Sequence, residues 1–101
     1  MCQTRRMISV VILYPKADDT TFDMDYYTSK HMPMFVSTMG EACKGWGVSG
    51  PAHKYHAVAW AMVDSKEAFD AAMAERGKEV MGDVRNYTNT RPEMIIGEVV
   101  V

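Results

Sequence analysis

The stretch at residues 7–14, MISVVILY, is apolar at nearly every position and rich in β-branched side chains. Successive side chains of a strand point to opposite faces, so such a run predicts a strand that is buried on both faces. Two later stretches, at residues 54–63 and 93–101, have the same two-sided apolar character. A sheet built from these strands must be covered on both faces, which restricts the folds that the chain can adopt.

The order of the segments predicts a ferredoxin-like α+β domain. A turn-rich loop at 15–21 follows the first strand, and a helix over 24–40 is expected next, capped at its start by the carboxylate of Asp23. A glycine-rich stretch at 43–50 reads as a weak strand that precedes the strong strand at 54–63. The first half of the chain is therefore expected to run β-α-β-β.

The second half completes the pattern with a helix and a strand. A helix is expected over 64–77, with Asp64 and Glu67 as its capping box and Gly77 at its C-terminal cap. An irregular connection over 78–92 then leads to the last strand. The predicted fold is βαββαβ with a four-stranded antiparallel sheet. We expect one domain over residues 1–101, with its core at 7–101.

Two helices can cover only one face of this sheet. On the strand at 54–63, Val58, Trp60 and Met62 alternate with small alanines, so the second face is apolar as well. An exposed apolar patch of that extent is larger than monomeric proteins usually carry. A second copy of the same sheet is the simplest cover. The sequence therefore predicts a homodimer through the sheet faces, a dimeric α+β barrel.

Composition and charge exclude several classes of function. The formal net charge is −2 and the basic residues are scattered, whereas a nucleic-acid-binding protein should show a basic face. No apolar run approaches the ~18 residues that a membrane span needs, so no membrane partner is expected. Cys2 and Cys43 form no metal or redox motif, and we expect a cytoplasmic, reducing location.

The motifs that would indicate a cofactor or a metal do not fit their required context. GWGVSG at residues 45–50 matches G-x-G-x-x-G, but that fingerprint needs a helix directly after it, and a strand follows instead. These glycines are better explained by a bent strand or by close approach of another group. His53 and His56 lack further ligands in a metal-binding pattern. We therefore expect neither a cofactor nor a metal.

His31 is the strongest candidate for chemistry. In the helix at 24–40 it shares the inward face with Tyr27, and Pro33 follows two residues later. Proline leaves the carbonyl of Ser29 without its helical partner, and helices distorted in this way often line cavities. Imidazole exchanges protons near neutrality and is neutral in an apolar pocket. The simpler alternative is a core histidine that is hydrogen-bonded to a neighbour.

Other side chains are expected to converge on the same space as His31. Polar or aromatic neighbours and apolar walls would make a pocket for a small apolar organic molecule, with His31 as the acid–base or hydrogen-bonding group. The expected neighbours are Tyr14, Tyr27, Asn86 and Tyr87, and the expected walls are Phe35, Trp46 and Trp60.

Several short stretches together resemble the EthD family (ethyl tert-butyl ether degradation) of the dimeric α+β barrel superfamily. The resemblance covers residues 7–101, and its pieces are YP (14–15), FDMDYY (22–27), HMP (31–33), WGV (46–48), VDSKEAF (63–69) and DVRNYTNTRPEMIIGEV (83–99). It implies a ferredoxin-like protomer, a homodimer, and a pocket between the helices and the sheet. It also implies that His31 is the histidine of the family's H-x-P element.

The resemblance implies a role in catabolism without fixing a reaction. The family carries the label oxidoreductase, while related domains of fungal aromatic polyketide pathways are described as dehydrating or decarboxylating. Cofactor-free acid–base catalysis of the lyase or isomerase type is one reading, and a non-catalytic accessory or carrier protein is another. A dimer with a solid core and a cofactor-free monooxygenase are the remaining alternatives.

Overall fold

The computed structural model describes residues 6–100, so Cys2 and Val101 lie outside the described residues. Four strands form one antiparallel sheet in the order β2-β3-β1-β4. Their bounds are Ile8–Pro15 for β1, Cys43–Ser49 for β2, Tyr55–Val63 for β3 and Glu93–Glu98 for β4. The expected ferredoxin-like α+β arrangement is confirmed.

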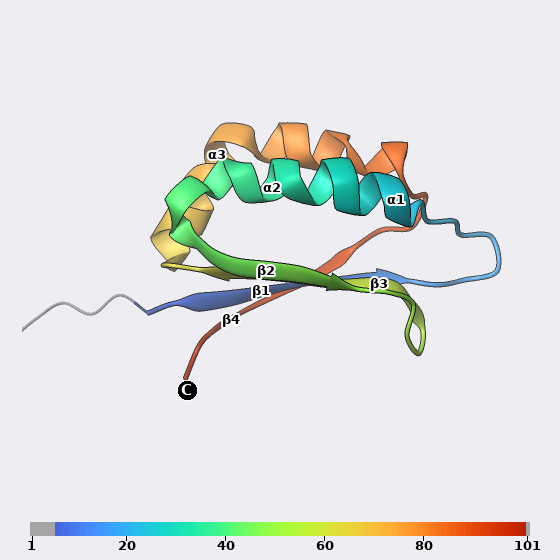
Figure 1. Cartoon of the computed structure of the whole chain (residues 1–101), viewed down its shortest axis with the longest axis horizontal. Coiled ribbons are helices and arrows are strands. Elements are labelled where there is room, and N and C mark those ends of the chain that lie inside the picture. The colour runs from blue at the N-terminus through green and yellow to red at the C-terminus, as the bar shows by residue number, and fades with distance from the viewer. Residues whose placement is uncertain (1–5, 101) are drawn as a thin grey trace, which may run out of the picture.

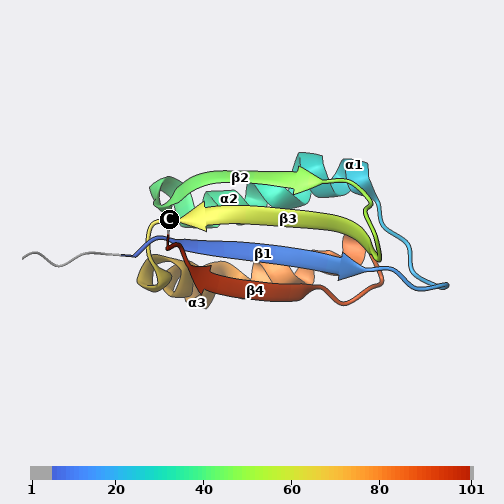
Figure 2. The ribbon, with the colours of Figure 1, turned by 90° about the horizontal axis from the view of Figure 1, so that it is seen from below.

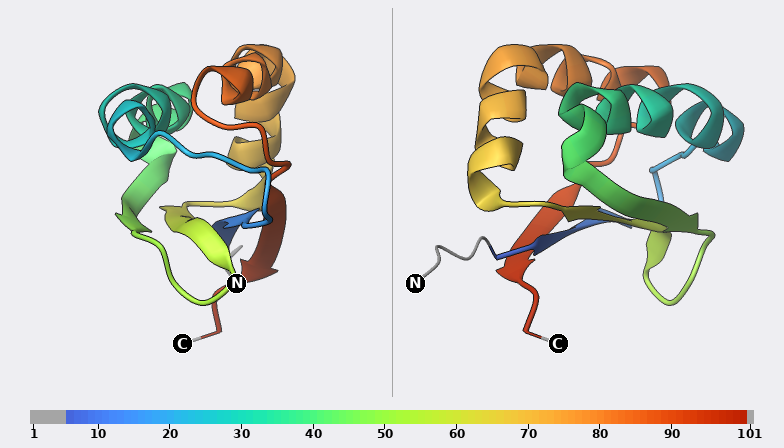
Figure 3. Two further views of the ribbon diagram at one scale, coloured as in Figure 1. Left: turned by 90° about the vertical axis from the view of Figure 1, so that its right-hand side faces the viewer. Right: turned by 60° about the vertical axis from the view of Figure 1, so that its left-hand side comes forward.

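The helices lie together on one face of the sheet (Figures 1 and 3). The first helical segment consists of α1 (Met24–Tyr26), a wide π-helical turn η1 (Tyr27–His31) and α2 (Met32–Met39), followed by a 3₁₀ turn η2 (Gly40–Ala42). The second consists of α3 (Lys66–Gly82) and a 3₁₀ turn η3 (Val84–Asn86). The two segments run side by side over the sheet and make one layer above it.

The core fills the space between these two layers. Alternate residues of β1 and β3 face the helices and are buried, whereas the residues between them face away, as the two-residue period of a strand requires. The helix-facing set on β3 is mostly alanine, which lets the helices approach closely, and β1 contributes larger side chains. The buried residues of the two strands are Ile8, Val10, Ile12, Tyr14, Ala57, Ala59, Ala61 and Val63.

The distortion expected around Pro33 is confirmed and has a definite form. The backbone N–H of Met32 bonds to the carbonyl oxygen of Tyr27, five residues back, and so closes a π-helical turn. The wide turn comes directly before Pro33, whose ring would otherwise meet the carbonyl of Ser29. The predicted cap at the start of the helix is also confirmed, because Asp23 accepts a hydrogen bond from the backbone N–H of Tyr26.

The predicted bounds of the second helix are wrong at both ends. Ser65, not Asp64, is the N-cap, since its side chain accepts from the backbone N–H of Ala68. At the other end the helix passes through Gly77 and continues to Gly82. The extension places Val80 in the core, where it is 4% exposed, and this burial outweighs the weak helix propensity of glycine.

The second face of the sheet has no helix over it (Figure 2). Val11 at the centre of β1 is paired with Trp60 on β3 and with Ile95 on β4, so the three side chains form a row across that face. Trp60 is 40% exposed and Ile95 is 59% exposed. In the described chain this apolar row, as the sequence predicted, is left open to solvent.

Gly47 on β2 is required by the indole of Trp60. A Cβ atom at this position would overlap Cζ2 of Trp60, closer than non-bonded carbon atoms approach each other. We therefore expect Gly47→Ala to displace the indole and to lower the free energy of unfolding by about 1–2 kcal/mol, as overpacking does. Thermal unfolding and tryptophan fluorescence measure the two effects.

Gly45 is the matched control for this substitution, because it lies on the same strand and a Cβ there meets nothing within 4 Å. Gly45→Ala should leave stability and fluorescence close to those of the wild type. Equal behaviour of the two variants would show that the Trp60 indole does not depend on Gly47.

Candidate functional site

The π-helical turn directs Tyr27 and His31 toward the sheet. His31 is 4% exposed and Tyr27 is completely buried. The imidazole stacks on the ring of Tyr27, with centroids 5.5 Å apart and planes within 16° of each other, and its centroid lies 4.6 Å from that of Tyr87. His31 is therefore held between two aromatic rings beneath the helices.

Asp83, at the C-terminal end of α3, holds the imidazole from its other side. Nδ1 of His31 lies 2.9 Å from Oδ2 of Asp83. The second carboxylate oxygen of Asp83 accepts from the hydroxyl of Tyr26 at 2.7 Å and from the side-chain amide of Asn86 at 2.8 Å. Both oxygens are thus engaged, and the carboxylate joins the two helical segments at the histidine.

Burial and hydrogen bonding shift the pKa values of His31 and Asp83 in opposite directions. Burial holds the pKa of His31 below its usual value, although the hydrogen bond and charge of Asp83 oppose this effect. Burial by itself raises the pKa of the Asp83 carboxyl, but its three hydrogen-bond donors outweigh burial and hold that pKa below its ordinary value. At neutral pH the pair is an ionised carboxylate and a neutral imidazole whose proton is on Nδ1. Nε2 is then the free basic nitrogen.

A cavity of about 70 Å³ lies beside His31, between the helices and the sheet. Its walls come from β1, η1, α2, the end of α3, η3, the chain that leads into β4 and β4 itself. Of the described residues that line it, Tyr14 and His31 carry the polar groups, and the rest are apolar: Ile12, Phe35, Val80, Met81, Val84, Pro92 and Met94. The cavity is a small apolar space with one base and one hydroxyl.

Tyr14, near the C-terminal end of β1, packs against the rings of Tyr27 and Tyr87. The hydroxyls of Tyr14 and Tyr87 lie 2.6 Å apart and share a hydrogen bond. The hydroxyl of Tyr27 is buried and interacts with the hydroxyl of Tyr14, but among residues 6–100 it makes no hydrogen bond of good geometry. Burial is the main reason that the pKa of each of the three phenols is raised. All three are therefore neutral hydrogen-bond donors at any physiological pH.

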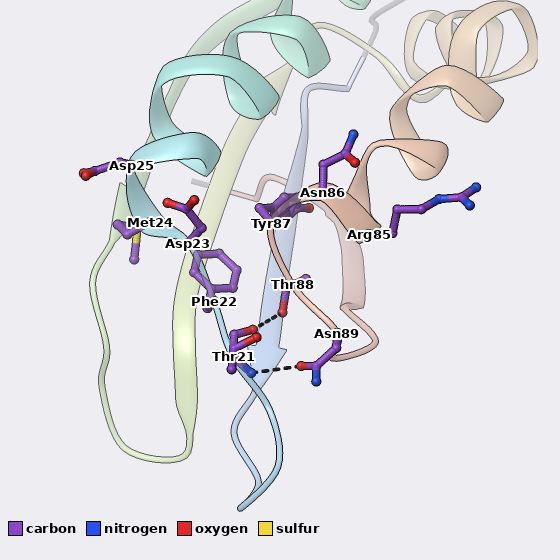
Figure 4. A pocket seen from close by; sticks show the side chains of 10 residues that line it. All are labelled: Thr21, Phe22, Asp23, Met24, Asp25, Arg85, Asn86, Tyr87, Thr88 and Asn89. Atoms are coloured by element: carbon purple, nitrogen blue, oxygen red, sulfur yellow. Dashed lines mark hydrogen bonds between the residues drawn. The ribbon is translucent and has the colours of Figure 1, made fainter.

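A larger and more open groove of about 660 Å³ lies on the outer side of this cluster (Figure 4). Its walls are the chain around Thr21–Asp25 and the chain around Arg85–Asn89, joined by hydrogen bonds from Thr88 to Thr21 and from Thr21 to Asn89. Asp25 and Arg85 point away on opposite sides of it. Because the groove is open and polar and excludes His31, the inner cavity is the better candidate site.

Most of the residues expected around His31 are near it in the structure. Tyr14 and Phe35 line the cavity with His31, while Tyr27 and Tyr87 contact the imidazole. Asn86 is exposed and contacts the carboxylate of Asp83 rather than the cavity. Their expected roles toward a ligand stay predictions.

Trp46 and Trp60 do not wall this cavity, and the expectation that they do is wrong. Trp60 lies between Ala59 and Ala61, which both face the helices, so its side chain must face the other way. Trp46 shares the helix side, opposite Ala61, but stands on the edge strand β2 and is 42% exposed. Neither indole is among the residues that line the cavity.

Sequence reasoning missed Asp83. The sequence predicts an irregular connection over 78–92 and assigns site roles there to Asn86 and Tyr87 only. The available signal was that Asp83 is the one acidic residue between Val80 and Pro92 in a segment expected to approach a buried histidine. Buried imidazoles commonly have a carboxylate partner.

Within the described part of the chain, no group of histidine, cysteine and acidic side chains is placed to hold a metal ion. Over the same residues, no helix combines the length and the apolar character that a membrane span requires.

The comparison with solved structures decides the family. The crystal structure of an EthD-like protein from Ralstonia eutropha JMP134 has a TM-score of 0.85 and is 38% identical, covering 96% of this chain and 95% of that one. The chain belongs to the EthD-like family. An ethyl tert-butyl ether degradation (EthD) family protein from Bacillus halodurans C-125 is also similar in fold, with a TM-score of 0.69 at 18% identity, covering 93% of this chain and 99% of that one.

The EthD-like fold is shared with a protein of named activity. SnoaB from Streptomyces nogalater, a cofactor-independent oxygenase, has a TM-score of 0.64 at 11% identity, covering 95% of this chain and 97% of its own. At that identity the likeness shows the fold alone. No family model and no curated protein matches this chain.

The pairing of His31 with Asp83 in this EthD-like chain predicts a measurable titration. In Asp83→Asn the carboxylate no longer opposes the effect of burial, so the pKa of His31 should fall below that of the wild type. The imidazole resonances of His31, followed by NMR across a pH series, measure the change.

Asp70→Asn is the control for this titration, since Asp70 is exposed and pairs with Lys66 at 2.7 Å on the outer face of α3. It should leave the titration of His31 unchanged. An unchanged or higher His31 pKa in Asp83→Asn would contradict the pairing.

Proposed function

We propose that this protein binds a small apolar organic molecule in the cavity beside His31 and performs cofactor-free acid–base chemistry on it in catabolic metabolism. The observation that supports this most is the buried imidazole whose Nδ1 is held by Asp83 at 2.9 Å and whose ring lines an apolar cavity. A base oriented by a carboxylate and shielded from water is the arrangement that proton transfer needs.

The cavity must widen to admit a ligand. Its volume of about 70 Å³ equals only a few water molecules, at roughly 30 Å³ each. Met81 and Met94 line it and are 56% and 43% exposed, so they stand where the cavity meets solvent. Methionine side chains adopt many conformations at little cost, and we expect these two to move aside when a ligand enters.

The same proposal includes a homodimer through the open sheet face. The support is the apolar row of Val11, Trp60 and Ile95, which no element of the described chain covers. In such a dimer the helices and the cavity would lie on the outer sides of the two sheets, so ligand entry past Met81 would remain open.

Two alternatives share the cavity and differ in chemistry. A carrier that holds a molecule for a partner enzyme needs the same cavity but no proton transfer at His31. A cofactor-free monooxygenase is favoured by the likeness in fold to SnoaB, and oxygen consumption would reveal it.

The first test compares the wild type with His31→Ala on a mixed panel of small lactones, phenols, aldehydes and polyketide-like aromatics. Mass spectrometry of the bound and free pools should find a compound that the wild type consumes and the variant leaves intact. Because protonation removes the basic lone pair, the rate should fall as the pH drops through the lowered pKa of His31.

A compound that both proteins retain unchanged would indicate a carrier and would contradict catalysis by His31. Consumption by both proteins at the same rate would show that the reaction does not use this histidine.

The proposed dimer predicts that Ile95→Arg weakens self-association by about tenfold or more, because a charge would be buried in an apolar interface. Sedimentation over a range of protein concentrations measures the dissociation constant. Ala74→Arg, on the exposed side of α3, is the matched control and should associate as the wild type does. Identical association of both variants would mean that the open sheet face is not the interface.

A further inference from the structure

The three tyrosine hydroxyls beside the cavity are not fully hydrogen-bonded to one another. Among Tyr14, Tyr27 and Tyr87 there is one hydrogen bond, between Tyr14 and Tyr87. The hydroxyl of Tyr27 is buried and interacts with the hydroxyl of Tyr14, but it makes no well-formed hydrogen bond among the described residues. Each hydroxyl can both donate and accept, so a single well-formed hydrogen bond leaves part of the hydrogen-bonding capacity of these buried groups unused, a condition that buried polar groups rarely show.

The cluster can therefore donate a hydrogen bond to a ligand through Tyr14, the one of the three tyrosines that lines the cavity. The three phenols are neutral because burial raises the pKa of each, so each keeps its proton. When Tyr87 donates to Tyr14, the proton of Tyr14 is left for a group in the cavity that Tyr14 lines. A ligand oxygen with free lone pairs can accept a hydrogen bond through that proton.

Tyr14 and His31 approach the cavity from opposite layers of the fold. Tyr14 belongs to β1 in the sheet, and His31 belongs to η1 among the helices. A molecule between them meets a hydrogen-bond donor on one side and the free Nε2 of a neutral imidazole on the other. This pair of groups polarises a carbonyl and removes a proton from a neighbouring carbon.

The charged groups around the cavity also restrict which ligand it can bind. No lysine or arginine is among the described residues that line the cavity, and the ionised carboxylate of Asp83 lies directly behind His31. An anionic ligand would be desolvated without a counter-charge, beside a like charge. An uncharged ligand avoids both costs.

Building on the proposed function, we infer that the substrate is an uncharged carbonyl compound with a hydrogen on the adjacent carbon, and that Tyr14 donates to its carbonyl oxygen while His31 removes that hydrogen as a proton. The C–H electron pair forms a C=C bond and the carbonyl π pair moves to the oxygen, which gives an enolate held by Tyr14. The imidazolium then returns the proton to carbon or to oxygen. No electrons enter or leave, so the reaction is an enolisation or an isomerisation.

Exchange of hydrogen for deuterium tests the inference directly. Cyclopentanone, 2-indanone and the anionic ketone levulinate are each incubated with the protein in D₂O, and loss of the proton signals beside the carbonyl is followed by NMR. The wild type should accelerate exchange for an uncharged ketone and not for levulinate. His31→Ala should abolish the acceleration, and Tyr14→Phe should reduce it by about a hundredfold, as loss of one donor to an oxyanion does.

Two further variants separate the role of Tyr14 from a general effect on the fold. Tyr55→Phe makes the same chemical change at the start of β3, away from the cavity, and should exchange as the wild type does. Tyr87→Phe removes the hydroxyl that aligns Tyr14 and should lower kcat with little change in KM. Circular dichroism checks that each variant is folded.

The outcomes distinguish this inference from the proposed function. Loss of exchange in His31→Ala with full exchange in Tyr14→Phe would overturn the role of Tyr14 and leave the base in place. No exchange of any ketone, with turnover of another compound that depends on His31, would overturn the substrate class alone. Failure of every compound to bind or react would overturn both.

Discussion

The apolar character of both sheet faces is the constraint on which the rest of the structure depends. One face is covered by the helices, and the alanines of β3 let those helices lie close to it. The other face carries the apolar row of Val11, Trp60 and Ile95, and no element of the described chain covers it. The cavity lies in the covered layer, so the surface proposed for association and the site proposed for chemistry are on opposite sides of one sheet.

The hydrogen bond between His31 and Asp83 is a central polar contact of that layer. It joins the π-helical turn to the end of α3, two segments that are far apart in the chain. The wide turn before Pro33 sets the direction of the imidazole, and the extension of α3 past Gly77 brings Asp83 to it. The π-helical turn and the extended end of α3 together place the His31–Asp83 pair beside the apolar cavity.

Features that depend on neighbouring residues could be predicted from the sequence. Features that depend on contacts between distant segments could not. Alternation along β1 and β3, the Asp23 cap and the distortion near Pro33 follow from neighbouring residues, and all are present. Trp60 is an expected wall of the cavity, but its place between two helix-facing alanines turns its side chain to the other face of the sheet. The second helix was ended at Gly77 because local propensity shows nothing of the burial of Val80.

The sequence by itself determined the order of the elements, the two apolar faces of the sheet and the inward position of His31, since each depends on the spacing of residues near one another in the chain. Only the tertiary structure decided that Asp83 binds His31 and that the hydroxyls of Tyr14 and Tyr87 meet. Those contacts join segments more than fifty residues apart. Their existence depends on how the helices pack on the sheet, which no local pattern encodes.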